Sequence, residues 1–250
     1  ERLLDAVRRY AVDYVVFNNH LPEAAALADS DPDTLVHWAR QAGRSRDEHV
    51  AAIRAAQARA TEVPRYLCRL AEAFDALGVR YGSHDDPDGE TREMYSMIGA
   101  KICEFPIRRT AAALARAVGD PILMGAPNVV RGGSQAGNVA ARDLLRAGLC
   151  DALVSDYHYP SLAEAAFRLV DADLMDLPAA WDLISRRPAE ILRLADRGVI
   201  DYGKRADLTV IDAETKAIEA TISGGRLTFL TGRAAERFLA TRDALALAAE

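Results

Sequence analysis

The feature that most constrains this chain is a repeating order of elements: a short apolar segment, a polar loop, and then a helix-like stretch. Segments rich in β-branched or other apolar residues, as strands are, lie at 12–17, 79–81, 102–105, 121–125 and 151–156. Between them, apolar residues recur at helical spacing over 33–77, 110–118, 140–147 and 161–169. Strands that alternate with helices in this way are typical of parallel βαβ units. The sequence therefore predicts an α/β fold built on a parallel sheet.

The last part of the chain has a different pattern. After a predicted helix at 181–194, the segments GVIDYGKRADLTVID and AIEATISGGRLTF alternate between apolar and polar residues and contain glycine turns, as antiparallel strands do. We therefore divide the chain into a barrel-like portion at 1–197, β-strands at 198–230 and a helical tail at 231–250. With 250 residues and 50% hydrophobic content, the chain can bury one large core.

Charge and cysteine content exclude several classes of protein. The 31 basic and 37 acidic residues give a net charge of -6, so there is no uniform positive field to bind nucleic acid. Cys68, Cys103 and Cys150 are odd in number and widely spaced, which predicts neither a disulfide framework nor a zinc knuckle. No apolar run approaches the roughly 18 residues that a membrane helix needs. We expect a cytoplasmic protein without a membrane or nucleic-acid partner.

Three candidate ligands for a metal ion follow predicted strands. His20, His84 and Asp156 come at or just past the ends of three different strands, and in a parallel barrel the carboxyl ends of the strands meet at one mouth. Imidazole and carboxylate groups are the usual ligands of catalytic Zn, Mn or Fe. A single histidine after a strand is more often a loop or core residue, whereas three candidates at three strand ends favour a metal site.

Asp156 and Asp85 have further expected roles. An Asp at the end of a strand is costly to bury unless it is paired or bound to a metal. We therefore expect Asp156 to be buried beside the metal and to accept a proton from the attacking water. Asp85 is expected to hold the second ring nitrogen of the neighbouring His84, although the SHDD segment has an alternative interpretation as a solvated turn.

The segment GAPNVVRGGSQAGN, at 125–138, has the composition of an anion-binding loop. Its glycines allow backbone N–H groups to approach an anion, Ser134 adds a hydroxyl, and Arg131 offers a planar fork of donors to phosphate or phosphonate oxygens. A helix that begins near residue 138 would direct its positive end toward the same place. The Walker and dinucleotide motifs are both absent from the sequence. The alternative is a glycine-rich loop that merely closes a βα unit.

Together these motifs resemble a known family. SHDD, EFP, LMGAPNVVRGGS, SDY and RGVIDYGKRADL stand in the order and at the spacing of the PhnM family of α-D-ribose 1-methylphosphonate 5-triphosphate diphosphatases, from about residue 15 to residue 227. The resemblance implies an amidohydrolase-type TIM (β/α) barrel followed by the C-terminal part of a small β-sandwich. It also implies a divalent metal, Zn, Mn or Fe, as one or two ions. His20, His84 and Asp156 would hold it, after strands five, six and eight.

The resemblance further implies a substrate and a reaction. A metal-activated water would attack a phosphorus of the ribosyl triphosphate and leave the 5-phosphate and diphosphate. Asn128, Arg131 and Ser134 would then face the phosphate or phosphonate end of this small phosphorylated phosphonate sugar.

The chain also departs from the family pattern, which leaves other functions open. The H-x-D or H-x-H motif after strand one and the carboxylate after strand four are absent, as if the chain began just before strand five, and Gln135 and an extra His158 alter two motifs. Such a barrel lacks its N-terminal strands, and its open apolar edges favour association with a second copy or with other phosphonate-pathway proteins. The alternatives are a dihydroorotase-like hydrolase of cyclic amides and an inactive barrel remnant that acts as a binding partner.

Overall fold

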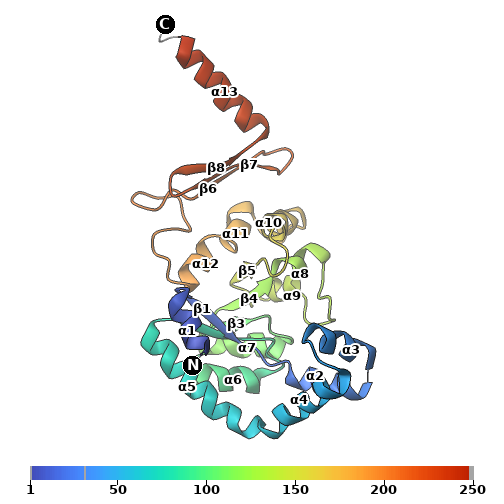
Figure 1. Cartoon of the computed structure of the whole chain (residues 1–250). Coiled ribbons are helices and arrows are strands. Elements are labelled where there is room, and N and C mark those ends of the chain that lie inside the picture. The colour runs from blue at the N-terminus through green and yellow to red at the C-terminus, as the bar shows by residue number, and fades with distance from the viewer. Residues whose placement is uncertain (1, 31, 248–250) are drawn as a thin grey trace.

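A computed structural model shows a larger α/β part that contains one parallel sheet, and a smaller C-terminal sheet that continues into a last helix (Figure 1). It describes residues 2–30 and 32–247. The smaller sheet lies next to helices from the end of the larger part, so the chain passes through the two parts in sequence order (Figure 1).

The larger part is organised around the predicted parallel sheet. Its strands are β1 (Tyr14–Phe17), β2 (Arg80–His84), β3 (Cys103–Glu104), β4 (Ile122–Gly125) and β5 (Ala152–Val154). They pair in sequence order, and every pair is parallel. The predicted strands are thus confirmed with slightly different bounds. The sheet has five strands. The assignment of His20, His84 and Asp156 to strands five, six and eight of a barrel stays a prediction.

Helices cover the sheet and connect its strands. They are α1 (Arg2–Arg9), α2 (Leu21–Ser30), α3 (Pro32–Gln41), α4 (Arg46–Ala58), the 3₁₀ turn η1 (Ala60–Glu62), α5 (Val63–Leu77), α6 (Gly89–Met97), α7 (Arg109–Val118), α8 (Ala126–Arg131), α9 (Ala141–Arg146), α10 (Ser161–Asp171), α11 (Leu177–Asp182), α12 (Arg186–Ile191) and α13 (Gly232–Leu247). Local sequence sets several of their ends. Ser45 and Glu48 form a capping box at the start of α4, and α5 ends at Gly78 in the left-handed conformation.

Two parts of the helical prediction are wrong. The segment at 126–131, expected to be part of the glycine-rich loop, forms α8, and Pro127 is tolerated because it lies in the first turn. The helix expected at 181–194 is two helices, α11 and α12. They are separated where the Leu183 carbonyl accepts a hydrogen bond of 2.8 Å from the Leu153 N–H of β5.

The main core lies between the sheet and the helices that follow β4 and β5. Its largest aliphatic side chains, each at most 2% exposed, are Ile122, Val129, Leu144, Leu153 and Leu169. Full burial of such a side chain stabilises the fold by about 1.5–3 kcal/mol. These residues hold β4, β5, α8, α9 and α10 together, and this packing fixes where the loops after the two strands begin.

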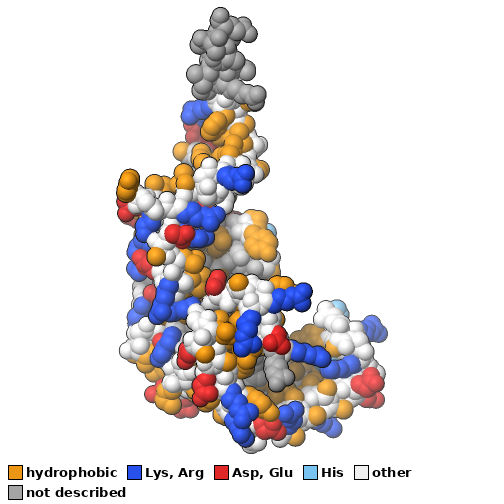
Figure 2. Space-filling model, turned by 60° about the vertical axis from the view of Figure 1, so that its left-hand side comes forward, with side chains coloured by type: hydrophobic (Ala, Val, Ile, Leu, Met, Phe, Trp, Pro, Cys, Tyr) orange, Lys and Arg blue, Asp and Glu red, His pale blue; other side chains and the backbone are white. Residues whose placement is uncertain are grey.

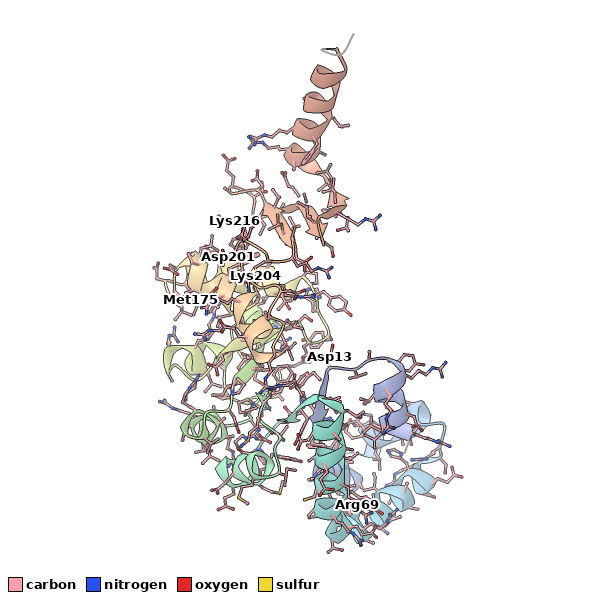
Figure 3. All side chains as sticks on the ribbon, turned by 90° about the vertical axis from the view of Figure 1, so that its left-hand side faces the viewer. Asp13, Arg69, Met175, Asp201, Lys204 and Lys216 are labelled. Carbon is pink, nitrogen blue, oxygen red and sulfur yellow. The ribbon has the colours of Figure 1, made fainter. Side chains whose placement is uncertain are left out.

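The C-terminal strands form a second sheet with antiparallel pairing. Its strands are β6 (Leu208–Ile211), β7 (Ile218–Ser223) and β8 (Arg226–Leu230), in the order β6-β7-β8. Lys204 and Lys216 lie where this part meets the helices of the larger part (Figure 3). The Lys204 ammonium donates to the Ala195 carbonyl, and Lys216 lies over the ring of Phe167 at 5.4 Å. These contacts attach the second sheet to α10 and the segment after α12.

The surface is mixed in charge. Basic and acidic side chains are interspersed over the face shown in Figure 2. Within residues 2–30 and 32–247, no helix has both the length and the apolar character needed to cross a membrane.

Candidate functional site

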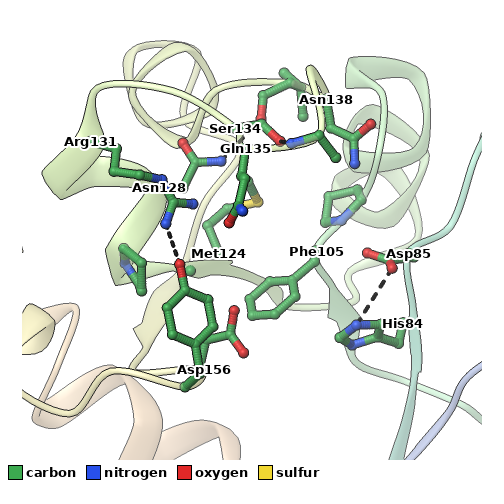
Figure 4. Close-up of a pocket in the computed structure, with 16 residues that line it drawn as sticks. His84, Asp85, Phe105, Met124, Asn128, Arg131, Ser134, Gln135, Asn138 and Asp156 are labelled. Carbon is green, nitrogen blue, oxygen red and sulfur yellow. Dashed lines mark hydrogen bonds and ion pairs between the residues drawn. The ribbon is translucent and has the colours of Figure 1, made fainter. Parts of the chain in front are cut away.

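A cavity of about 250 Å³ opens at the carboxyl ends of β2, β4 and β5 (Figure 4). Most of the residues singled out in the sequence line it: His84, Asp85, Asn128, Arg131, Ser134 and Asp156. Figure 4 shows two facing sides. We call His84 and Asp85, with Glu104 behind them, the histidine wall, and we call Asn128, Arg131, Ser134 and Tyr157 the arginine wall. The convergence of strand ends on one mouth, predicted from the βα pattern, is therefore observed for two of the three strand-end ligands.

The histidine wall is held by bonds between neighbouring strands. His84 is the last residue of β2, and its register partner on β3 is Glu104. The His84 Nδ1 lies 2.6 Å from the Glu104 carboxylate, and its Nε2 lies 3.6 Å from the Asp85 carboxylate. Phe105 packs against the ring edge-on, with centroids 5.0 Å apart. The imidazole thus has a carboxylate at each nitrogen, and Glu104 has the shorter contact.

Burial and charge act in opposite directions on the histidine wall. Burial by itself lowers the pKa of His84, but the hydrogen bond with Glu104 and the charges of three nearby carboxylates raise that pKa by more. Burial raises the pKa of Asp85, against the lowering effect of the two histidines near it. Asp85 also has a φ of 58°, in the left-handed region, where its N–H donates to the Glu104 carbonyl at 3.0 Å.

A buried arginine lies next to the histidine wall. Arg92 of α6 is fully buried and donates to the Ser83 hydroxyl at 2.6 Å and to the Ile102 carbonyl at 3.2 Å. It also forms ion pairs with the buried carboxylates of Asp86 and Asp120, each at 3.3 Å. Ser83 and Asp86 flank His84 and Asp85 in the chain, so these bonds fix the backbone that presents the histidine wall.

The arginine wall is built from α8 and the glycine-rich loop after it. The Asn128 side-chain oxygen accepts a hydrogen bond of 2.9 Å from the Ala141 N–H, so this amide ties the start of α9 to α8. The Ser134 hydroxyl oxygen accepts from the Ala136 N–H at 3.2 Å. Arg131 is exposed at the mouth and donates to the Tyr157 hydroxyl. The helix expected near residue 138 begins at Ala141 instead, and it has only six residues.

Asp156 lies in the cavity, but in a different setting from the expected one. It follows β5 by two residues, has a φ of 51°, and is exposed. The prediction that Asp156 is buried is therefore wrong. The strand ends earlier than expected, and the turn carries the carboxylate outward. The expected role of Asp156 as a proton acceptor stays a prediction.

His20 does not join the other candidate ligands. It lies outside the cavity lining, its side chain is 59% exposed, and its ring nitrogens contact Asn18 at 3.0 Å and Glu23 at 3.4 Å. Among the described residues, no group of three or more His, Cys, Asp or Glu side chains is arranged to hold a metal ion. His84, Asp85 and Asp156 share one cavity and are chemically suitable donors, yet the described residues as they stand do not form a metal site.

Sequence reasoning missed two residues of this site, Glu104 and Tyr157. Their position in the chain could have pointed to both, because Glu104 ends a strand and Tyr157 lies in the loop directly after one. The same position identified His84 and Asp156. Glu104 sits in a strand of only two residues, and its contact with His84 comes from the register between β2 and β3. That register is a tertiary property, which a single sequence does not reveal.

Comparison with known proteins agrees with the resemblance seen in the motifs. No family model matches the chain. The chain is 46% identical over 146 residues to α-D-ribose 1-methylphosphonate 5-triphosphate diphosphatase from Escherichia coli K12. The match covers 58% of this chain and 37% of that protein. The similarity to PhnM is thereby confirmed, over little more than a third of the relative's length.

Solved structures agree on the fold. A β-aspartyl dipeptidase from Fervidobacterium islandicum AW-1 matches with a TM-score of 0.51 and 14% identity, over 67% of this chain and 53% of its own. An amidohydrolase matches with a TM-score of 0.51 and 13% identity, over 67% of this chain and 49% of its own. The chain thus spans about half the length of these structures. At such identities the likeness shows the fold alone, and this fold is shared with an amidohydrolase.

Proposed function

We propose that this chain forms the substrate pocket of a hydrolase of phosphonate metabolism, which cleaves α-D-ribose 1-methylphosphonate 5-triphosphate to the 5-phosphate and diphosphate. The 46% identity to the Escherichia coli diphosphatase carries the proposal. The pocket supports it, because one wall offers an arginine and hydroxyl groups to an anionic substrate and the other offers an imidazole with carboxylates. The match spans 37% of that relative. The activity of the relative as a whole is therefore part of the proposal.

The residues of the pocket have distinct parts in this reaction. An oxygen of water bonds to phosphorus, the P–O bond to the departing diphosphate breaks, and the proton of water passes to a base. We assign that proton to Asp156, and the position of its carboxylate in the cavity, accessible to solvent, supports this assignment. Arg131 offsets the negative charge on the phosphate oxygens. Glu104 holds the His84 ring in one orientation toward the pocket.

A divalent metal, Zn, Mn or Fe, belongs to the proposal because the PhnM resemblance implies it. The described residues do not assemble a ligand set, so we assign no step of the reaction to the metal. Elemental analysis of the purified protein tests this part directly. Metal that copurifies and is lost in His84→Ala supports the proposed dependence, whereas protein that hydrolyses the substrate after complete removal of metal contradicts it.

Diphosphate release from the ribosyl triphosphate, measured with Zn or Mn present, tests the activity. We expect Arg131→Gln to raise KM about 10- to 100-fold, because a charge-assisted pair with phosphate is lost. Arg168→Gln is the matched control, since Arg168 lies on α10 in an exposed pair with Glu164. A protein that releases no diphosphate but hydrolyses cyclic amides would contradict the proposal.

A further inference from the structure

We infer that Tyr157, together with Arg131, binds a phosphate or phosphonate group of the substrate, an inference that rests on the proposed function for the identity of that substrate. Tyr157 lines the cavity and is 64% exposed, and its hydroxyl accepts a hydrogen bond from the Arg131 guanidinium. The two side chains come from separate segments, Arg131 from the end of α8 and Tyr157 from the loop after β5, and meet at the mouth of the pocket.

The charge on Arg131 makes the mouth of the pocket attractive to an anion. Its guanidinium donates to the Tyr157 hydroxyl, and no carboxylate of the described residues forms an ion pair with it. The carboxylates of the pocket lie with His84 and at Asp156, as Figure 4 shows. An arginine without a carboxylate partner retains donors for phosphate or phosphonate oxygens.

The direction of the hydrogen bond gives Tyr157 its role. The Arg131 N–H donates to the phenolic oxygen, so the phenolic O–H still has its own proton to donate. A hydroxyl that accepts from a cation is polarised into a stronger donor. An oxygen of a phosphate or phosphonate group at the mouth can therefore accept from the guanidinium and from the phenol at once.

The loop that carries Tyr157 is held in place by its own hydrogen bonds. Asp156 adopts a left-handed φ of 51°, and the His158 N–H donates to the Ser155 carbonyl at 3.0 Å. The Ser161 hydroxyl at the start of α10 donates to the His158 carbonyl at 2.5 Å. The residue that lengthens this motif, His158, thus braces the turn, and the turn directs the phenol toward Arg131.

Binding of methylphosphonate and of inorganic phosphate, measured by isothermal titration calorimetry on the purified protein, tests the inference without requiring turnover. Tyr157→Phe removes only the hydroxyl, and we expect it to raise the Kd for both probes about tenfold, the effect of losing one hydrogen bond to a charged group. Tyr159→Phe is the matched control, because Tyr159 is two residues away, 82% exposed and outside the cavity lining. We expect its Kd to change by less than about twofold.

Two further measurements separate recognition from a structural role. The thermal unfolding of Tyr157→Phe should match that of wild type, and where turnover is measured the variant should raise KM with little change in kcat. A Kd for Tyr157→Phe equal to that of wild type overturns the inference, even if diphosphate release is normal. If Tyr157→Phe weakens the binding of methylphosphonate but the wild-type protein releases no diphosphate, the inference stands and the proposed function is contradicted.

Discussion

The two walls of the pocket are built in different ways. The histidine wall stands on adjacent strands, with a register contact between His84 and Glu104 and the fully buried Arg92 next to it. The arginine wall stands on α8, which has six residues and ends at the exposed Arg131, and on the loops that carry Ser134 and the exposed Tyr157. One wall is held by polar contacts among β2, β3 and α6, and the other by hydrogen bonds of α8 and of the loops beside it.

One fold can in this way combine a rigidly held chemical group with a recognition group whose position can adapt. Ser83 and His84 are consecutive in β2, and consecutive side chains of a strand point to opposite faces. Ser83 therefore reaches Arg92 while His84 reaches the pocket. A change next to the histidine wall should alter stability first, whereas a change on the arginine wall should alter binding with little effect on stability.

Loss of Arg92 should have the largest effect on stability. Arg92→Met would leave the carboxylates of Asp86 and Asp120 buried without a cation, which costs about 3–5 kcal/mol of unfolding free energy. Urea unfolding measures this loss. If Arg92→Met does not fold, Ser83→Ala removes one partner of the same group and should cost about 1–2 kcal/mol.

Arg168→Met is the control for this prediction. Arg168 forms an ion pair with Glu164 on α10, and both side chains are about half exposed, so we expect a change below about 1 kcal/mol. Equal losses of unfolding free energy for Arg92→Met and Arg168→Met would show that the buried ion pairs of Arg92 do not support the histidine wall.

Adding a single methyl group should change the unfolding free energy differently at the two walls. Gly82 is buried in β2, and a Cβ there would lie 2.8 Å from the Cβ of Ile102 and closer still to the Ile102 carbonyl oxygen. Gly82→Ala must push β2 and β3 apart, so we expect the unfolding free energy, measured by urea unfolding, to fall by about 1–3 kcal/mol.

Gly133→Ala, in the loop between Arg131 and Ser134 of the arginine wall, is the matched change. A Cβ at Gly133 meets no atom within 4 Å, and its φ is outside the left-handed region. The substitution should therefore leave stability unchanged or raise it by about 0.4–1 kcal/mol, through a less flexible unfolded chain. If Gly133→Ala lowers the unfolding free energy as much as Gly82→Ala does, the two walls do not differ in rigidity.

The same difference explains what could be predicted from the sequence. The strands, the C-terminal antiparallel sheet and the position of Arg131 follow from local patterns of apolar residues and glycine. His84 was identified because it ends a strand, and strand ends meet at one mouth in a parallel sheet. These features depend on neighbours in the chain or on a general rule of topology.

The features that were missed depend on contacts between distant segments. Glu104 reaches His84 across two strands, and the break between α11 and α12 comes with a bond from β5 to the Leu183 carbonyl. The exposure of Asp156 and the position of His20 outside the cavity depend on the path of loops after their strands. A single sequence contains no direct signal for any of these contacts.

The charge of His84 should give a smaller, pH-dependent effect that is confined to the histidine wall. Its pKa in the folded protein is raised: burial lowers it, but Glu104 and neighbouring carboxylates outweigh burial. Protonation of His84 therefore favours the folded state. This stabilisation is complete below the unfolded pKa of about 6.5 and is lost as the pH rises through the folded pKa. The difference in unfolding free energy between wild type and His84→Gln should thus be larger at about pH 6 than at about pH 8.5.

Titration of the His84 ring by NMR identifies the cause of this effect. Glu104→Gln removes both the charge and the ionic hydrogen bond at Nδ1, so the pKa of His84 should fall relative to wild type. Glu93→Gln, on the exposed side of α6, is the control for loss of a carboxylate and should leave that pKa unchanged. If Glu104→Gln leaves the titration in place, the contact between β2 and β3 does not set the charge of His84, and the histidine wall is then no more fixed than the arginine wall.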